Sequence, residues 1–393
     1  MHRMIRARLA NLKHLVAAVI FLALAACACE VGLRAHSVLY PTPQRYQAAE
    51  QLLVRSGSTF QELRPLQSVE VMAAGSREPV VLNTNSLGLR GPEPLVPKPK
   101  RVFRIVCLGD ETVLGADVAA SDTFCQQLQT LMGDHTERTV EVINAGVPGF
   151  CPVLSYLQFR RKLQGLQADV VLLQFDMSDV SNAGVYRRYT LSDERAGPIS
   201  CPHPGLQQHA DGALNGWCRE FRTVRWCFDY VGRFVSDVPV LDMQHPASGA
   251  EQYRWLQQEV NVWQQDLDVA LAPIANLQQL TNAVGAQLMV CVLPSPWQLA
   301  HQLRRRTGTG AEKRGVGRLP FEMVAGYLEA RQIAYIDASD GFLRTARPRQ
   351  LFLESAPRLS AQGHAVLAQQ LNSHLLGTVT SLRIQQMERA AAH

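Results

Sequence analysis

The stretch RIVCLGDETVLG, from Arg104 to Gly115, decides how the fold is interpreted. An apolar run leads into Gly109-Asp110, a polar residue follows, and Gly115 closes the turn. Many α/β enzymes use a turn of this kind, directly after a strand, to present a nucleophile at the end of a sheet. The residue expected to be that nucleophile is Glu111. The sequence therefore places a carboxylate where such a turn usually presents a hydroxyl.

Five apolar runs of strand length begin at Val102 and alternate with helix-like segments. The runs are VFRIVCLGD, TVEVINAG, ADVVLLQF, QLMVCVLPS and IAYIDAS, and the segments are 123–132, 153–166, 252–284 and 320–331. Nearly continuous apolar strands are covered on both faces, and strand–helix alternation favours a parallel sheet. With right-handed crossovers, we expect a flavodoxin-like, three-layer α/β/α sandwich with a central parallel sheet. Ligands bind such sheets at the carboxyl ends of the strands, where GDE, NAGVPG and DMSD fall.

The first 34 residues are expected to direct the chain to a membrane. A basic segment without acidic residues precedes an apolar run from Leu15 to Cys29. The basic flank should stay cytoplasmic, which places the remaining chain outside the cytoplasm, on the periplasmic side. Glu30 and Arg34 fit an interfacial helix end and favour an uncleaved anchor. The alternative is a lipoprotein, because LAAC resembles a lipobox with Cys27 as the lipidated residue.

Changes in composition divide the remaining chain. Residues 35–100 are interpreted as a stalk and an N-terminal appendage, 101–375 as the main domain and 376–393 as a tail. Within the main domain, 185–250 breaks the strand–helix alternation and is interpreted as an insertion over the rim of the site.

Cysteines and charges exclude some classes of function. Cys201, Cys218 and Cys227 cluster in the insertion, and in an exported protein a disulfide between two of them is an open alternative. Their spacing is not that of metal ligands, so we expect no metal, and we expect no cofactor. Much of the net charge of +5 lies in the N-terminal segment and in scattered arginines, and the basic stretch 304–306 is interpreted as a solvated loop rather than a nucleic-acid site.

Over about residues 83–375 the chain resembles the SGNH/GDSL hydrolase family, in particular its membrane-anchored bacterial members. The blocks that carry the resemblance are NSLGLRG, RIVCLGDETVLG, VINAGVPGF, LLQFDMSDV, VLPSP and SAPRLSAQGH. Their order and their positions at strand ends matter more than any single block. The resemblance implies an SGNH hydrolase-like fold and ester hydrolysis or acyl transfer, often on carbohydrates or lipids.

In that family, a serine after Gly-Asp attacks, backbone and Asn donors hold the oxyanion, and a His and an Asp supply the base and its orienter. This sequence matches the pattern at Gly146 and Asp179. It has Glu111 at the position of the nucleophile, Ser178 at the position of the Asn and Arg358 at the position of the His. The family's Asp falls on Ser355 or Ala356, and neither is acidic.

These replacements remove the chemistry that the resemblance implies. A carboxylate is a poor acyl acceptor, and a guanidinium does not deprotonate in proteins. We therefore expect a pseudoenzyme that acts as a binding or accessory module for a glycan or an acylated ligand, with Arg358 available to an anionic group. The candidate binding residues are Asp110, Glu111, Asn144, Gly146, Asp179 and Arg358.

Two further expectations concern the site. Because the family places nucleophile and base in contact, we predict an ion pair between Glu111 and Arg358. An active esterase or acyltransferase with a rearranged site is the alternative, and a protein of a membrane-anchored glycan acetylation system is a third possibility. Substitute catalytic groups would come from Ser355, Ser360, His364, Asp179 and Asp110. Asp110 also suits a turn, Ser360 a helix cap, and His364 a packing role.

Overall fold

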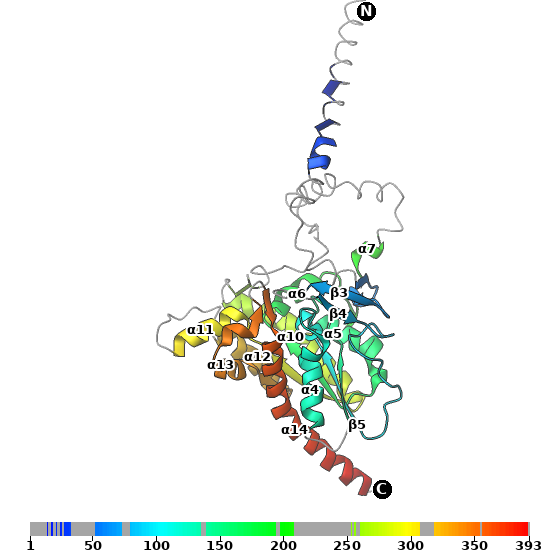
Figure 1. The fold of residues 1–393 in the computed structure, drawn as a ribbon, viewed down its shortest axis with the longest axis vertical. Helices are drawn as coiled ribbons and strands as arrows, with labels where there is room; N and C mark the ends of the chain where they lie inside the picture. Colours follow the sequence, from blue (N-terminus) through cyan, green and yellow to red (C-terminus); the bar gives the residue numbers. More distant parts are fainter. Residues whose placement is uncertain are drawn as a thin grey trace, which may run out of the picture. The chain divides into compact units, whose positions relative to one another are not determined.

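The computed structural model describes the chain in segments. They are 52–72, 79–134, 139–193, 197–207, 253, 255–256, 260–306, 318–353 and 356–391, with 14, 17–18, 21, 24–25 and 27–32 near the N-terminus. The chain divides into two compact units, 1–44 with 207–244 and 45–206 with 245–393. The sheet, its helices and the candidate site belong to the second unit (Figure 1).

Five parallel strands form the central sheet in the order β11-β10-β7-β5-β6. They are β5 (Val102–Leu108), β6 (Thr139–Asn144), β7 (Val170–Phe175), β10 (Gln287–Val292) and β11 (Ala334–Asp337). The chain leaves β5 for β6 on one side and returns to β7 on the other, so the strand order reverses between β5 and β7. This is the flavodoxin-like order, and it confirms the predicted parallel sheet.

The sequence of β5 shows why both faces of the sheet are covered. Phe103, Ile105 and Cys107 join one hydrophobic cluster, whereas Val106 and Leu108 join the other. Alternate residues of a strand project to opposite faces, so an uninterrupted apolar run requires a layer on each side. None of these five residues is more than 1% exposed.

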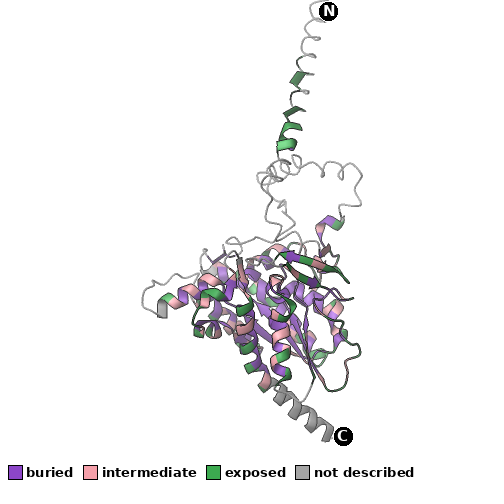
Figure 2. Ribbon diagram, viewed as in Figure 1, coloured by how far each residue is buried: buried purple, intermediate pink, exposed green. Residues whose placement is uncertain are grey.

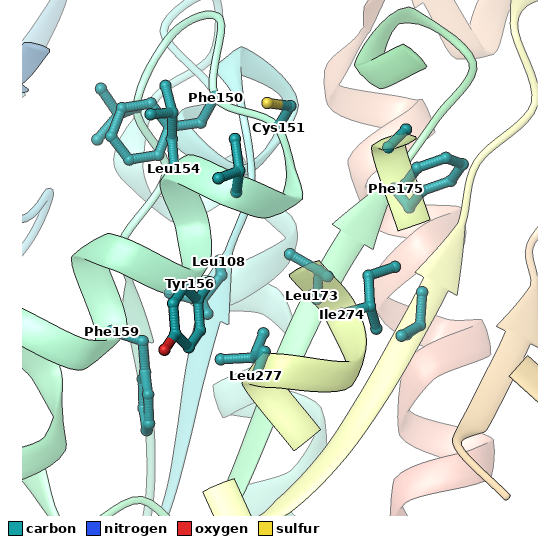
Figure 3. Close-up of a cluster of buried hydrophobic side chains, with 14 of the residues drawn as sticks. Leu108, Phe150, Cys151, Leu154, Tyr156, Phe159, Leu173, Phe175, Ile274 and Leu277 are labelled. Atoms are coloured by element: carbon teal, nitrogen blue, oxygen red, sulfur yellow. The ribbon is translucent and has the colours of Figure 1, made fainter. Parts of the chain in front are cut away.

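Helices form the two outer layers. One face carries α4 (Phe124–Gly133), α11 (Pro296–Arg306), α13 (Ser339–Arg344) and α14 (Ala361–Ala391). The other carries α5 (Pro152–Gln158), α6 (Ser178–Tyr186), α10 (Val260–Ala283) and α12 (Leu319–Glu329). Figure 2 shows the buried sheet between these layers, and Figure 3 shows Leu173 and Phe175 of β7 close to Ile274 of α10. Because α14 continues to Ala391, the tail expected from residue 376 is helical.

Two antiparallel hairpins precede the sheet. They are β1 (Leu53–Arg55) with β2 (Gln61–Leu63) and β3 (Ser68–Met72) with β4 (Pro79–Asn83). Leu52, Phe60, Leu63, Val71 and Leu82 are buried in the same cluster as Val106 and Leu108 of β5. The hairpins thus share a core with one face of the sheet, while the division into domains stays a prediction.

Some expectations fall wholly or partly outside the described residues. The anchor over 1–34 lies mostly outside them, and no helix within them has the length and hydropathy to cross a membrane. Of the insertion, the structure describes β8 (Leu191–Asp193), β9 (Gly197–Ser200) and α7 (Pro204–Gln207). Cys201 carries a free, buried thiol, which contradicts a disulfide through this residue. Cys218 and Cys227 lie outside the described residues.

Candidate functional site

The turn after β5 depends on glycine and on a capping carboxylate. Gly109 has a φ of +151°, and a Cβ there would lie 2.6 Å from both Gln174 Oε1 and Val113 Cγ2. The short helix α3 (Glu111–Leu114) follows, and Asp110 Oδ1 accepts the Thr112 N–H at 2.8 Å to cap it. This turn places Glu111 at the carboxyl end of β5.

The carboxylate of Glu111 binds a backbone donor from the loop after β6. The N–H of Gly149 donates to Glu111 Oε2 at 3.0 Å. Gly146, which the resemblance assigned to the site, instead donates to Asn144 Oδ1 at 3.1 Å. A Cβ on Gly146 would lie 2.2 Å from the Leu114 nitrogen, so this glycine allows close backbone packing. The donor glycine is therefore Gly149, the second glycine of NAGVPG.

The residues after β7 form a closed network of hydrogen bonds. Asp176 Oδ1 accepts the Ser178 N–H at 2.7 Å and the Ser178 hydroxyl at 2.5 Å. The Asp176 N–H donates to Asp179 Oδ2 at 2.9 Å. Ser178 stands where the family has an Asn donor. Its hydroxyl thus donates to Asp176.

Gln174 connects the two strand ends at the point where the strand order reverses. Its Oε1 accepts the Asp110 N–H at 3.4 Å, and its Nε2 donates to Asp176 Oδ2 at 3.2 Å. Gln174 was not predicted as a site residue, although it is the one polar residue in the buried strand VVLLQF.

Four carboxyl groups gather at this edge, and we call Asp110, Glu111, Asp176 and Asp179 the acidic edge. Burial raises the pKa of Asp110 well above its usual range, and the charges of Glu111 and Asp176 add to the effect. Burial is also the main cause that raises the pKa of Asp176 and of Asp179. Within the described part of the chain, no lysine, arginine or histidine forms an ion pair with any of the four. Burial therefore favours the protonated forms of Asp110, Asp176 and Asp179.

Aromatic side chains of the segment before α10 lie next to the acidic edge, and one of them contacts Trp297 at the start of α11. The Trp255 indole N–H donates to the Met177 carbonyl at 2.9 Å. The rings of Tyr253 and Trp297 meet edge to face, with centroids 4.3 Å apart. Burial raises the pKa of Tyr253, and all four carboxylates of the acidic edge raise it further. Neither Tyr253 nor Trp297 was predicted as a site residue.

Arg358 stands on β13 (Ala356–Leu359), and its guanidinium pairs with Asp117. Arg358 Nε lies 2.7 Å from Asp117 Oδ2, and Nη2 donates to Oδ1 at 3.1 Å. The predicted Glu111–Arg358 pair is wrong: both side chains are in the described part of the chain, and no ion pair joins them. Asp117 follows α3 closely and offers Arg358 a carboxylate in place of Glu111.

The other candidate groups contact the backbone. Asn144 Nδ2 donates to the Val113 carbonyl at 2.6 Å. Ser360 Oγ donates to the Gln350 carbonyl at 2.6 Å and accepts the Gly363 N–H at 3.2 Å, as expected of a helix cap. Ser355 lies outside the described residues, and the side chain of Ala356 is not described.

His364 has a packing role rather than a place beside Glu111. Its Nδ1 accepts the Phe124 N–H at 3.2 Å, and its ring stacks on that of Phe124. Burial, aided by the charge of Arg90, lowers the pKa of His364 to about 3. Among the described histidines, cysteines and acidic residues, no group of three or more is arranged to hold a metal ion.

Comparisons with known proteins give matches among solved structures. No protein-family model and no curated protein matches the chain. An acetylxylan esterase from Geobacillus stearothermophilus, in the form of a catalytic mutant, shares 12% identity over 68% of this chain and 92% of its own, with a TM-score of 0.37. A lipase/acylhydrolase from Enterococcus faecalis shares 10% identity over 70% of this chain and 96% of its own, with a TM-score of 0.37. A GDSL-like lipase from Bacteroides thetaiotaomicron shares 11% identity over 72% of this chain and 93% of its own, with a TM-score of 0.36. The solved structures that this chain resembles are thus esterases and lipases of the GDSL/SGNH type.

Proposed function

We propose that this chain is a non-hydrolytic, glycan-binding module with an SGNH/GDSL hydrolase-like fold. The observation that carries the proposal is the hydrogen bond from the Gly149 N–H to the Glu111 carboxylate. In ester hydrolysis, such a backbone donor would serve an oxyanion that forms next to an attacking hydroxyl. Here a carboxylate takes the donor, and its negative charge opposes a second negative charge beside it.

The other positions of the family pattern support the same proposal. The Ser178 hydroxyl donates to Asp176, so it is turned away from the role of an oxyanion donor. Arg358 is paired with Asp117, and a guanidinium stays protonated and accepts no proton from a nucleophile. The nucleophile, the base and the side-chain donor are therefore all replaced by groups with other partners.

The alternative, an active esterase or acyltransferase with a rearranged site, gains no support from the described candidates. Ser360 donates its hydroxyl proton to the Gln350 carbonyl, which is not a base. His364 uses Nδ1 for the Phe124 N–H and is buried. Without a base to activate it, a serine hydroxyl is a weak nucleophile.

A glycan is the ligand class that the side chains at this edge favour. Carboxyl oxygens accept hydrogen bonds from sugar hydroxyls, and the partly exposed ring of Trp297 offers an apolar surface to a sugar ring. The basic segment and apolar run at the N-terminus support a tether that leaves this module outside the cytoplasm. Removal of residues 1–34 should then release the protein from the membrane fraction of cells.

An ester-hydrolysis assay tests the loss of chemistry. The purified full chain in detergent should hydrolyse 4-nitrophenyl acetate no faster than buffer does. Three variants should give the same result, namely Glu111→Ala, Ser360→Ala and the control Glu70→Gln, whose carboxylate is exposed on β3. Turnover that is lost in either of the first two but kept in the control would overturn the proposal.

A further inference from the structure

The hairpin of β8 and β9 carries two exposed aliphatic side chains next to each other. Leu191 is 58% exposed and Ile199 is 38% exposed. The pairing register shifts between Leu191 and Ser192, so Ile199 and Ser200 of β9 together lie opposite Leu191. A single exposed leucine is ordinary, but two neighbouring aliphatic side chains on a short hairpin form an apolar patch.

Two arginines hold β9 against the body. Arg160 and Arg161 lie in the π-helical turn Phe159–Leu163 that continues α5. Arg160 Nη1 donates to the Pro198 carbonyl at 2.9 Å, and Arg161 Nη2 donates to the Ile199 carbonyl at 3.0 Å. A guanidinium has five N–H donors, so each arginine keeps donors for an acceptor outside the protein.

Arg187 and Arg188 add two exposed cations between α6 and β8. The ion pairs of the described residues include none of these four arginines. The hairpin strands contribute one acidic residue, Asp193, so four arginines against one aspartate leave a net charge of +3. We call this group of residues the cationic hairpin: Leu191, Ile199, Arg160, Arg161, Arg187 and Arg188.

The cationic hairpin is joined to the part of the body that the chain enters from its N-terminal segment. Thr59 forms a bridge with Cys201, directly after β9, and the Phe60 N–H donates to the Cys201 carbonyl at 2.6 Å. Eighteen residues, 35–52, separate the proposed tether over 1–34 from β1, and they reach at most about 60 Å when fully extended. A membrane that holds the tether is therefore within reach of this side of the body.

We propose that the cationic hairpin docks on the anionic phospholipid surface of the membrane that holds the proposed tether. The arginines bind lipid phosphates, and the two aliphatic side chains enter the boundary between headgroups and acyl chains. A soluble polyanion would match the charge but would leave Leu191 and Ile199 in water, so the two features together favour a lipid surface. This inference rests on the proposed tether and goes beyond the proposed glycan binding.

A tryptophan probe in the full chain, reconstituted into lipid vesicles, tests the docking. Leu191→Trp places the probe in the cationic hairpin. Because β9 packs on α5 and α10, Thr130→Trp at an exposed position of α4 places a control probe on the other helical layer. The vesicles contain phospholipids brominated on the acyl chains, which quench a tryptophan that enters the bilayer. The unmodified chain gives the background of the five native tryptophans.

We expect quenching at position 191, and none at position 130, in vesicles that contain phosphatidylglycerol. In vesicles of phosphatidylcholine alone, the ratio of docked to undocked protein should fall on the order of 100-fold, as a net charge of +3 at an anionic surface implies. High salt should lower the ratio in the phosphatidylglycerol vesicles.

Variants in the Leu191→Trp background locate the attraction. Arg187→Gln with Arg188→Gln removes two cations and should lower the docked ratio about 30-fold. Ile199→Ser keeps every charge and should lower it about tenfold through lost apolar burial. The matched control is Arg347→Gln with Arg349→Gln, two exposed arginines that follow α13, and it should change nothing. Circular dichroism of each variant confirms that it is folded.

The outcomes separate docking from its alternatives. Equal quenching at positions 191 and 130, or quenching that is the same with and without phosphatidylglycerol, would overturn the proposal. If dextran sulfate binds the chain through Arg187 and Arg188 while the probe at 191 stays unquenched, the surface binds a soluble polyanion instead. If the chain floats with neither kind of vesicle, the tether and the docking are both wrong. Glycan binding and ester hydrolysis are measured without vesicles, so the proposed function stands or falls separately.

Discussion

Arg358 and Asp117 form a two-point ion pair between the last strand and the turn that follows α3. Nε lies 2.7 Å from Oδ2, Nη2 donates to Oδ1 at 3.1 Å, and the two side chains are only 16% and 11% exposed. Two-point pairing fixes direction as well as distance, so the guanidinium is held in a structural role. Glu111, which the family pattern places opposite this position, binds the Gly149 N–H instead.

Removing the carboxylate of this pair should destabilise the fold. Asp117→Asn leaves the Arg358 charge largely buried without its full partner, so we expect a loss of about 2 kcal/mol in the free energy of unfolding. Urea denaturation measures it, and the double variant with Arg358→Gln should recover part of the loss, as a double-mutant cycle reveals for interacting side chains. A loss no larger than that of Glu70→Gln would show that the pair contributes nothing.

Glu111→Gln should make the protein more stable at neutral pH. The amide retains an oxygen for the Gly149 N–H but removes a charge beside three carboxyl groups, and this Glu111 charge contributes to the raised pKa of Asp110, Asp176 and Asp179. We expect a gain of about 0.5–1 kcal/mol, typical of a binding residue retained at a cost in stability. Thermal unfolding at pH 7 measures the gain, and a lower melting temperature would contradict it.

The raised pKa values give the acidic edge a defined pH dependence. Burial raises the pKa of Asp110 above 3.8, its value without burial, so between the two pKa values the folded state holds more protons than the unfolded state. Stability from this group is therefore present at low pH and lost as pH rises toward the folded pKa.

Asp110→Asn isolates that contribution, because the amide oxygen can still cap Thr112. The difference in melting temperature between Asp110→Asn and the unmodified chain should grow as pH rises from about 4 to 7, in favour of the variant. Scanning calorimetry across this range checks it. A difference that stays constant, or that grows toward acid, would mean that Asp110 titrates normally in the folded protein.

Arg90 should prove important to the turn, although it precedes β5 in the chain. Its Nη1 donates to the carbonyls of Leu114 and Gly115, and its Nη2 donates to that of Val118. Burial lowers the pKa of Arg90 to about 10, so the side chain stays charged at neutral pH. The carbonyls at the end of α3 favour such a cation. Arg90→Gln should cost about 2–3 kcal/mol in unfolding free energy, measured by urea denaturation. An unchanged midpoint would show that water replaces the guanidinium without loss.

The sheet could be predicted from the sequence because the burial of a strand follows from the strand's own residues. A run such as VVLLQF has side chains that must be covered on both faces, and β7 and its neighbours are found where such runs occur. The two hairpins over 53–83 were not predicted within the appendage expected over 35–100, because their strands are short and only partly buried. Their burial depends on a sheet that forms later in the chain.

The site was predicted less completely because its contacts are tertiary. Motif order correctly placed Asp110, Glu111 and Asp179 at strand ends, since strand ends of a parallel sheet share one edge. It could not give side-chain direction, and so it missed that Asp117 competes for Arg358. Tyr253 stands at the start of the segment 252–284 that was predicted to be helical, but α10 begins only at Val260, so the helical pattern did not indicate where Tyr253 lies.

Arg104, the first residue of the stretch that decides the fold, should be one of the least replaceable positions in β5. Its side chain is 0% exposed; Nε lies 2.6 Å from Glu141 Oε2, and the two terminal nitrogens donate to the carbonyls of Leu166 and Leu95 at 2.5 and 2.8 Å. Arg104→Met keeps the apolar stem but leaves one carboxylate and two carbonyls without their donor. We therefore expect a loss of about 3–4 kcal/mol in unfolding free energy. Arg104→Lys keeps the charge, yet a single ammonium cannot reach three acceptors in a fork, so it should still lose about 2 kcal/mol. Urea denaturation of both variants distinguishes charge from geometry, because a lysine variant as stable as the unmodified chain would show that charge alone holds this strand.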